Sequence, residues 1–251
     1  MEELLLTEIY KFSFIFLRIG SALMMMPGYS SSYVNIRLRL SFALIISIIL
    51  IPFLNEYIPQ PANNFTENIR MFLAEICYGL FLGIIMQLLY FAINICGNFV
   101  GQASGFANAQ IFDPTTQNQS IISETFLSLL AITVIFITDL HHLMLDAVID
   151  SYSIWPAGSN LPTDDMAKYL STVMNDSFIL GFKIGAPFVA FILIFYTGMG
   201  LLSRLMPQLN IFFLSLPLQI YLGLGLLLMT CPVMIMWFCH YYESHLTQLI
   251  R

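Results

Sequence analysis

The sequence predicts an all-α membrane protein, and three observations support this fold class. Of its 251 residues, 58% are hydrophobic and only 10% are charged, whereas about 25% of residues are charged in typical soluble domains. The run from Leu205 to Tyr242 contains no Lys, Arg, Asp or Glu, and as a helix it is longer than the ~30 Å hydrocarbon core of a bilayer. The apolar stretches are continuous rather than alternating, which favours helices over a β-barrel.

About six hydrophobic helices are expected along the chain. They lie at about 9–26, 40–54, 71–100, 121–149, 178–203 and 211–240. The first is interrupted by Lys11 and Arg18, which predicts a retained helix rather than a cleavable signal. The second is short and suits a tilted or partly inserted helix. Before the fifth segment, Met166, Leu170 and Met174 predict a short amphipathic helix.

The distribution of charge predicts how the helices are oriented. Arg37, Arg39 and Arg204 fall in the first and fifth connections, while acidic residues gather in or near the second and fourth. The positive-inside rule therefore places both termini outside and the odd-numbered connections in the cytoplasm. The net charge of −6 is carried by few residues and provides no basic patch for nucleic acid.

Seven glycines are in four-residue register in or next to the apolar segments. They are Gly79 and Gly83, then Gly97, Gly101 and Gly105, then Gly181 and Gly185. Glycine at positions i and i+4 flattens one helix face, so that another backbone can approach closely. Gly97, Gly101, Gly181 and Gly185 are therefore candidate helix-packing residues. Packing within the chain and packing against other subunits both remain open.

Arg18, Glu75 and Lys183 are ionisable residues inside hydrophobic segments. A charge at mid-membrane costs about 2.5–3.5 kcal/mol on insertion scales, so each of them needs a partner or water. One interpretation is ion coupling, as in a small secondary transporter. The others are buried ionic pairing, exposure to an aqueous pore, and, for Glu75 and Lys183, snorkelling towards a segment end.

The sequence contains no catalytic constellation. Asp139, His142, Asp146 and Asp150 lie near one face of the fourth helix, and such a stripe can hold a metal. A solvated rim at the outer end of a helix explains the same stripe and is the preferred interpretation. Known nucleophile, zinc and phosphate motifs are missing, so we expect neither an enzyme nor a cofactor.

An uncharged segment between two long apolar stretches is a candidate pore element. It comprises Gly105, Phe106, Ala107, Asn108, Ala109, Gln110, Ile111 and Phe112. Irregular backbone at membrane depth is tolerated only where protein buries it or where it lines an aqueous cavity. The alternative is a structural loop that packs against its neighbours.

The sequence from Gly198 to Gly223 contains Arg204-Leu-Met-Pro207-Gln208-Leu-Asn210, followed by Pro217. It resembles the FliR family of flagellar export-gate proteins and their type III secretion counterparts, in which R-x-x-P-Q-x-N precedes a proline-containing final helix. Further matches along the chain are Arg18, Pro27, Gly105, Asp113, Pro114, His141, Ser151, Pro156 and Gly158. Two positions depart from the family pattern, Asn35 in the first loop and Leu140 before the histidine.

The resemblance implies one copy of this chain in a helical export gate with FliP and FliQ, in the bacterial inner membrane at the flagellar basal body. It implies a FliP-like part at 1–177 and a FliQ-like hairpin at 178–251, with Gly105–Phe112 as the plug. Arg204, Pro207, Gln208 and Asn210 would form a cytoplasmic loop that contacts FlhB. FlhA, rod proteins and unfolded export substrates are further implied partners. The expected function is a non-enzymatic channel component, flagellar or injectisome, and the alternative is the ion-coupled transporter.

Overall fold

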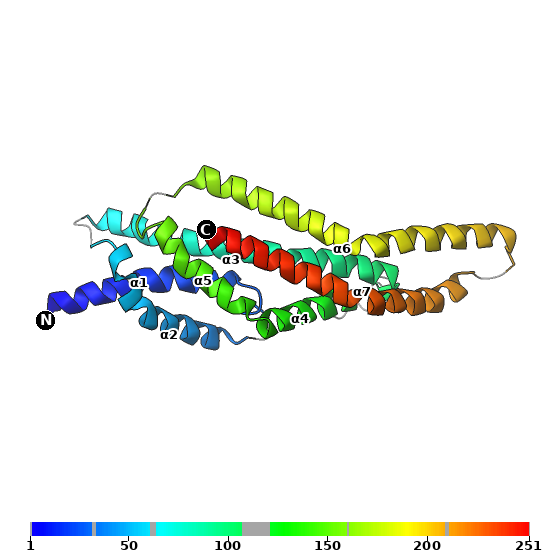
Figure 1. Cartoon of the computed structure of the whole chain (residues 1–251), viewed down its shortest axis with the longest axis horizontal. Coiled ribbons are helices and arrows are strands. Elements are labelled where there is room, and N and C mark those ends of the chain that lie inside the picture. The colour runs from blue at the N-terminus through cyan, green and yellow to red at the C-terminus, as the bar shows by residue number, and fades with distance from the viewer. Residues whose placement is uncertain are drawn as a thin grey trace. The chain divides into compact units, whose positions relative to one another are not determined.

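The computed structural model describes residues 2–31, 34–60, 64–106, 121–159, 161–208 and 211–250. Within these ranges the chain is helical and contains no β-strand (Figure 1). The helices are α1 (Glu2–Met25), α2 (Ile36–Leu54), the 3-10 turn η1 (Asn55–Tyr57), α3 (Phe65–Ala103), α4 (Ile122–Ile137), α5 (Leu140–Ile154), α6 (Thr163–Leu205) and α7 (Ile211–Ile250). The predicted all-α class is confirmed.

The helices differ in two places from those that the sequence predicts. The expected helix at 121–149 is broken into α4 and α5 after Ile137. Asp139 at the break has φ 58, a left-handed conformation that Asp tolerates better than most residues. The expected amphipathic helix at Met166–Met174 is the first part of α6, because neither glycine nor proline separates it from the apolar residues that follow.

Several helices are suited to a membrane. Four are long and apolar enough to cross one, namely α2 with η1, α3, α6 and α7, and the bent pair α4 and α5 makes a fifth if it counts as one span. With 39, 43 and 40 residues, α3, α6 and α7 exceed the roughly 20 residues that a bilayer core requires. The membrane class is therefore confirmed together with the helical class.

The chain divides into two compact units. The first comprises residues 1–89, 138–174 and 243–251, and the second comprises 90–137 and 175–242. In the first unit α1 packs against α2 and α5 around buried side chains such as Phe14, Leu82 and Tyr152. In the second unit Ile93, Leu127, Phe188 and Phe238 form the buried core. The division at 177 and 178, which rests on family likeness, stays a prediction, and α6 runs through it without a break.

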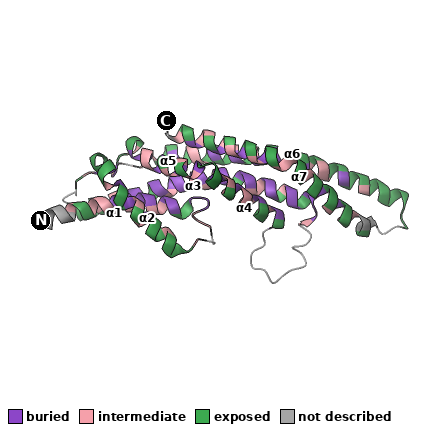
Figure 2. Ribbon diagram, turned by 60° about the horizontal axis from the view of Figure 1, so that its bottom comes forward, coloured by how far each residue is buried: buried purple, intermediate pink, exposed green. Residues whose placement is uncertain are grey.

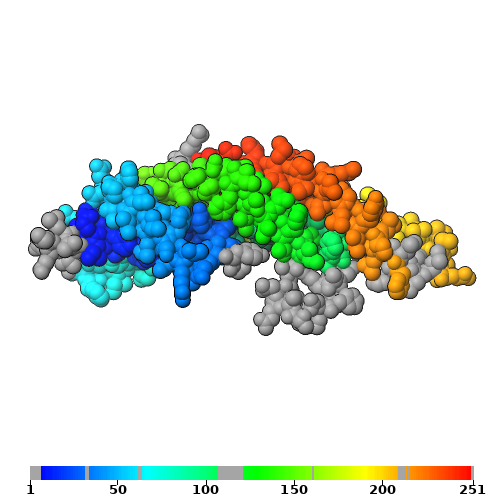
Figure 3. Space-filling view, turned by 90° about the horizontal axis from the view of Figure 1, so that it is seen from below, coloured from blue at the N-terminus to red at the C-terminus, as the bar shows by residue number. Residues whose placement is uncertain are grey.

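Large apolar side chains are exposed along α2, α6 and α7, as the green stretches of Figure 2 show. On α2, which lies at the surface of the first unit (blue in Figure 3), Leu38, Ile45, Ile48 and Phe53 are 55–71% exposed. Monomeric soluble proteins rarely expose contiguous apolar surface on this scale. These faces are therefore suited to lipid or to partner proteins.

Candidate functional site

The first unit contains a fully buried ion pair. Arg18 Nε donates to Glu75 Oε2 at 2.7 Å, and Arg18 Nη2 donates to Glu75 Oε1 at 3.1 Å. Both side chains have no solvent exposure. This bidentate geometry is the strongest arrangement open to an arginine and a carboxylate, and each charge compensates the other.

Further contacts complete the hydrogen bonding of this pair. Arg18 Nη1 donates to Ser151 Oγ at 3.2 Å, Arg18 Nη2 donates to the Trp155 carbonyl at 3.0 Å, and the Gly158 amide donates to Glu75 Oε1 at 3.1 Å. The rings of Tyr78 and Tyr152 lie 4.8 and 3.9 Å from the Arg18 Cζ. The cluster thus connects α1, α3, α5 and the turn after α5, and a buried pair satisfied in this way acts as a structural tie.

Two glycines bring α1 and α3 close enough for this ion pair. A side chain at Gly79 would overlap Ser21 Oγ and the Arg18 carbonyl, and one at Gly83 would lie 2.6 Å from Met25 Cβ. The backbones can approach only because both positions lack a Cβ. The four-residue glycine register was therefore a sequence signal for the contact that pairs Arg18 with Glu75.

Lys183 is placed differently from the other two predicted ionic residues. It is exposed on α6 in the second unit and forms no ion pair with the residues that the structure describes. It lines a cavity of about 230 Å³ together with Pro187, Thr230 and Trp237. The structure thus brings together Arg18 and Glu75 and leaves Lys183 outside their cluster.

The four candidate packing glycines contact helices of their own chain in the second unit. A Cβ at Gly97 would lie 2.7 Å from Glu124 Cα, and one at Gly101 would overlap Ile121. These two positions seat the start of α4 against α3. The face of α3 that they form is therefore covered by the start of α4 in the same chain.

The second pair of packing glycines seats α6 against another part of α3. A Cβ at Gly181 would lie 2.7 Å from the Ala92 carbonyl oxygen, and one at Gly185 would lie 2.5 Å from Phe99 Cδ2. For all four glycines the structure shows packing within the chain, which is one of the two interpretations that the sequence leaves open.

The last turn of α3 is held by α7. Gln219 is 3% exposed and its Nε2 donates to the Gln102 carbonyl at 3.0 Å, which satisfies one of the carbonyls left open at a helix end. A Cβ at Gly223 would lie 2.7 Å from Ser104 Cα. Sequence reasoning did not single out Gln219 or Gly223, although an amide within the charge-free run was a visible signal.

The predicted plug begins just after the last turn of α3. Gly105 is buried and has φ +73, a conformation that glycine adopts at little cost, and Phe106 follows it as a half-buried residue. Ala107, Asn108, Ala109, Gln110, Ile111 and Phe112 lie outside the described residues. Where the chain is described again, Ile121 lies against Gly101.

The predicted cytoplasmic loop joins α6 to α7. Arg204 lies in the last turn of α6, where a cation is favourable for the helix dipole. Arg204, Pro207 and Gln208 are all exposed, and Asn210 lies outside the described residues. The described part of the loop therefore presents its polar groups to solvent.

Only part of the predicted acidic and histidine stripe comes together. His142 Nδ1 lies 3.6 Å from Asp139 Oδ1, and the ligand atoms of Asp139, His141 and His142 lie within 4.8 Å of one another. Asp146 and Asp150 are not members of this group. Asp139 and His142 are exposed and His141 is half-buried, so the group lies at the surface of the α4–α5 bend.

Comparison with known proteins places this architecture in a family. The sequence profile of "Bacterial export proteins, family 1" matches residues 9–245. The flagellar biosynthetic protein FliR of Caulobacter vibrioides is 32% identical over 237 residues, which is 94% of each chain.

More distant relatives include a second flagellar protein and a Yop translocation protein. FliR of Bacillus subtilis is 29% identical over 227 residues, 88% of this chain and 86% of its own. The Yop proteins translocation protein T of Yersinia pestis is 25% identical over 162 residues, 64% of this chain and 62% of its own. Because the family profile and the Caulobacter relative both cover nearly the whole length, the chain belongs to the FliR family of bacterial export proteins.

Proposed function

We propose that this chain is a core subunit of the flagellar type III export gate and forms part of the channel through which unfolded substrates cross the inner membrane. The names of its relatives support this, since the two with the highest coverage given above are flagellar biosynthetic proteins. Its membrane-length helices with exposed apolar faces fit a subunit that is buried in lipid and among neighbours.

The segment Gly105–Phe112 acts as the resting plug of the channel. The observation that carries this proposal is the fixed start of the segment, where Gly105 is buried and Gln219 donates a hydrogen bond to the nearby Gln102 carbonyl. A segment that is held at its start can fill a pore without being carried away by a substrate. Phe106, Ile111 and Phe112 exclude water, and the lack of charge avoids strong binding to a passing chain.

In this proposal the subunit catalyses no reaction. Its partners are FliP and FliQ in the gate, FlhB at the cytoplasmic loop that contains Gln208, and FlhA, rod proteins and unfolded substrates during export. These assignments follow from the family resemblance. They fit a chain in which Arg18 and Glu75, the charged side chains buried among the described residues, are paired with each other.

The ion-coupled transporter is disfavoured by the geometry of its candidate residues. A transport site needs groups that can exchange partners with an ion or a proton. Arg18 and Glu75 are instead engaged with each other, with Ser151 and with two backbone groups. Lys183 belongs to the other unit. These residues support a scaffold role better than a coupling role.

Deletion of Phe106–Gln110 tests the plug. In the assembled gate we expect the deletion to raise membrane permeability to small ions and dyes, and to slow growth when the gate is overproduced, because an open pore dissipates the ion gradient. Dye uptake and conductance in vesicles measure the effect.

The matched control is deletion of Thr115–Gln119, which shortens the connection between α3 and α4 by the same number of residues but leaves Gly105–Phe112 intact. A gate that lacks Phe106–Gln110, assembles normally and conducts no more than its parent would show that the segment only packs against neighbours. Loss of substrate export when the whole gene is deleted, restored by the intact gene, tests the membership in the export apparatus separately.

A further inference from the structure

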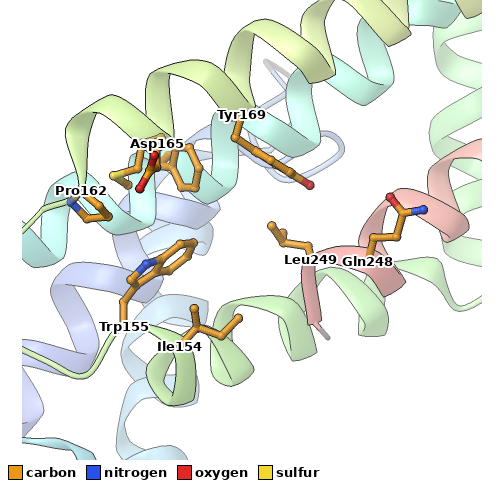
Figure 4. Close-up of a pocket in the computed structure, with 9 residues that line it drawn as sticks. Ile154, Trp155, Pro162, Asp165, Tyr169, Gln248 and Leu249 are labelled. Atoms are coloured by element: carbon orange, nitrogen blue, oxygen red, sulfur yellow. The ribbon is translucent and has the colours of Figure 1, made fainter.

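A pocket of about 490 Å³ opens in the first unit between the end of α5, the start of α6 and the end of α7 (Figure 4). Its volume is in the range of known ligand pockets, about 300–1,000 Å³. Aromatic side chains line it, namely Phe81, Trp155 and Tyr169, and polar groups are few, chiefly Asp165 and Gln248. The function proposed above makes no use of it.

The aromatic wall is preformed. The rings of Trp155 and Phe81 pack edge to face, with centroids 5.7 Å apart. The ring of Tyr78 stacks on Trp155, with centroids 5.6 Å apart. The Trp155 carbonyl accepts the hydrogen bond from Arg18, so the buried ion pair also fixes the turn that carries the indole. Tyr169 extends the wall, with its ring 6.3 Å from Phe81. A ligand would therefore meet rings that are already positioned.

The charge of the pocket is negative. Asp165 is the one carboxylate among its lining residues, which include no Lys, Arg or His. Its neighbour Asp164 pairs with Lys168 at 2.8 Å, whereas Asp165 has no ion-pair partner among the described residues. Both aspartates lie in the first turn of α6, where a negative charge is favourable for the helix dipole. The difference is the face they occupy, since Asp165 is on the pocket side in Figure 4.

We infer that this pocket binds a lysine or arginine side chain of a partner protein, with the aliphatic stem against the rings and the cation at Asp165. Aromatic faces attract cations through the ring quadrupole, and a carboxylate beside them adds a charge-assisted hydrogen bond. An amine-bearing lipid headgroup fits less well. It would bring a phosphate close to Asp164 and Asp165, and the lining has no cation to hold that phosphate.

Small cations test the chemistry of the pocket on the purified full-length chain in detergent. With Trp237→Phe in the background, the remaining fluorescence reports Trp155. Butylguanidinium should produce a saturable change, and hexanamide, a neutral analogue of similar size, should bind about tenfold more weakly. Asp165→Asn should remove this preference, whereas Asp164→Asn should leave the affinity for butylguanidinium within about twofold.

The two aspartate variants are matched, because each removes one charge from the same helical turn. Equal binding of butylguanidinium and hexanamide would overturn the proposal. So would an equal loss of binding in the two variants, which would indicate a general effect of negative charge. Far-UV circular dichroism of both variants shows whether α6 is intact.

A photocrosslinking residue at position 154, which replaces Ile154 on the pocket rim, identifies the source of the cation in cells. We expect a crosslink to a protein segment that contains Lys or Arg, with a yield that falls at least severalfold in Asp165→Asn and is retained in Asp164→Asn. Crosslinks to lipid alone, or a yield indifferent to Asp165, would overturn the assignment to a partner protein. This outcome is independent of the plug, which the permeability assay tests.

Discussion

Arg18 and Glu75 carry opposite charges without solvent exposure, so each is tolerated only because of the other. Removing one partner leaves an uncompensated charge in the core, which typically costs about 3–5 kcal/mol. We expect Arg18→Met and Glu75→Gln to lower the unfolding temperature of the purified chain strongly. The double variant Arg18→Met with Glu75→Leu should recover part of the loss, because it leaves no buried charge. Thermal unfolding followed by intrinsic fluorescence measures all three.

The control for this prediction is Lys168→Met. It breaks the ion pair with Asp164, whose side chains are 71% and 86% exposed, and exposed pairs contribute little to stability. If Glu75→Gln were no more destabilising than Lys168→Met, the buried cluster would not be the structural tie described above.

Single residues also show what the sequence can predict of the site. Arg18 and Glu75 are visible as charges within apolar segments, but their contacts with Ser151, Trp155 and Gly158 arise only when distant segments fold together. Gln219 was missed for the same reason. Its role depends on the Gln102 carbonyl, more than a hundred positions earlier in the chain, and no local pattern links the two.

At the scale of helices, glycine spacing determines which faces meet. On α6, Gly181 contacts the backbone of α3, whereas Gly198 on the same helix has nothing within 4 Å. Gly181→Leu should therefore destabilise the isolated chain, since overpacking commonly costs about 1–3 kcal/mol. Gly198→Leu should leave its unfolding temperature unchanged or slightly higher, because Leu favours the helix more than Gly does.

Thermal unfolding of the two variants, together with complex yield on native gels, separates packing within the chain from assembly. A stable Gly198→Leu chain that fails to enter the complex would identify its face as a subunit contact. An isolated Gly181→Leu chain as stable as the parent would contradict the packing that the structure places at this position.

The long apolar helices could be predicted, whereas the breaks between helices could not. Continuous hydrophobicity is sufficient for α3 and α7, which the predicted segments 71–100 and 211–240 match apart from their ends. The break between α4 and α5 has neither glycine nor proline to announce it and depends on the left-handed backbone of Asp139. The extension of α6 back to Thr163 was missed because its polar first turns lack the hydrophobicity that defines a span.

At the scale of the whole molecule, the exposed apolar faces of α2, α6 and α7 indicate a chain that is covered by lipid and neighbours when it works. Polar loops are then the places where soluble domains of partners can bind. The loop between α6 and α7 is such a place, because Pro207 ends one helix and Gln208 is exposed. An exposed side-chain amide such as that of Gln208 can form hydrogen bonds with the unpaired backbone N–H and C=O groups at a helix end. That helix can be in this chain or in a partner.

Combining Gln208→Ala with Asn210→Ala should therefore weaken co-purification of FlhB and leave assembly with FliP and FliQ intact. The two amides are removed without any change to the apolar faces that would hold the gate together. Lys168→Ala serves as the control. It removes an exposed polar side chain too, but one that lies on α6 and outside this loop. Affinity purification of the gate with quantification of all four proteins measures the effect. Undiminished recovery of FlhB would exclude this loop as its contact, and joint loss of FliP and FliQ would show that the loop is needed for assembly itself.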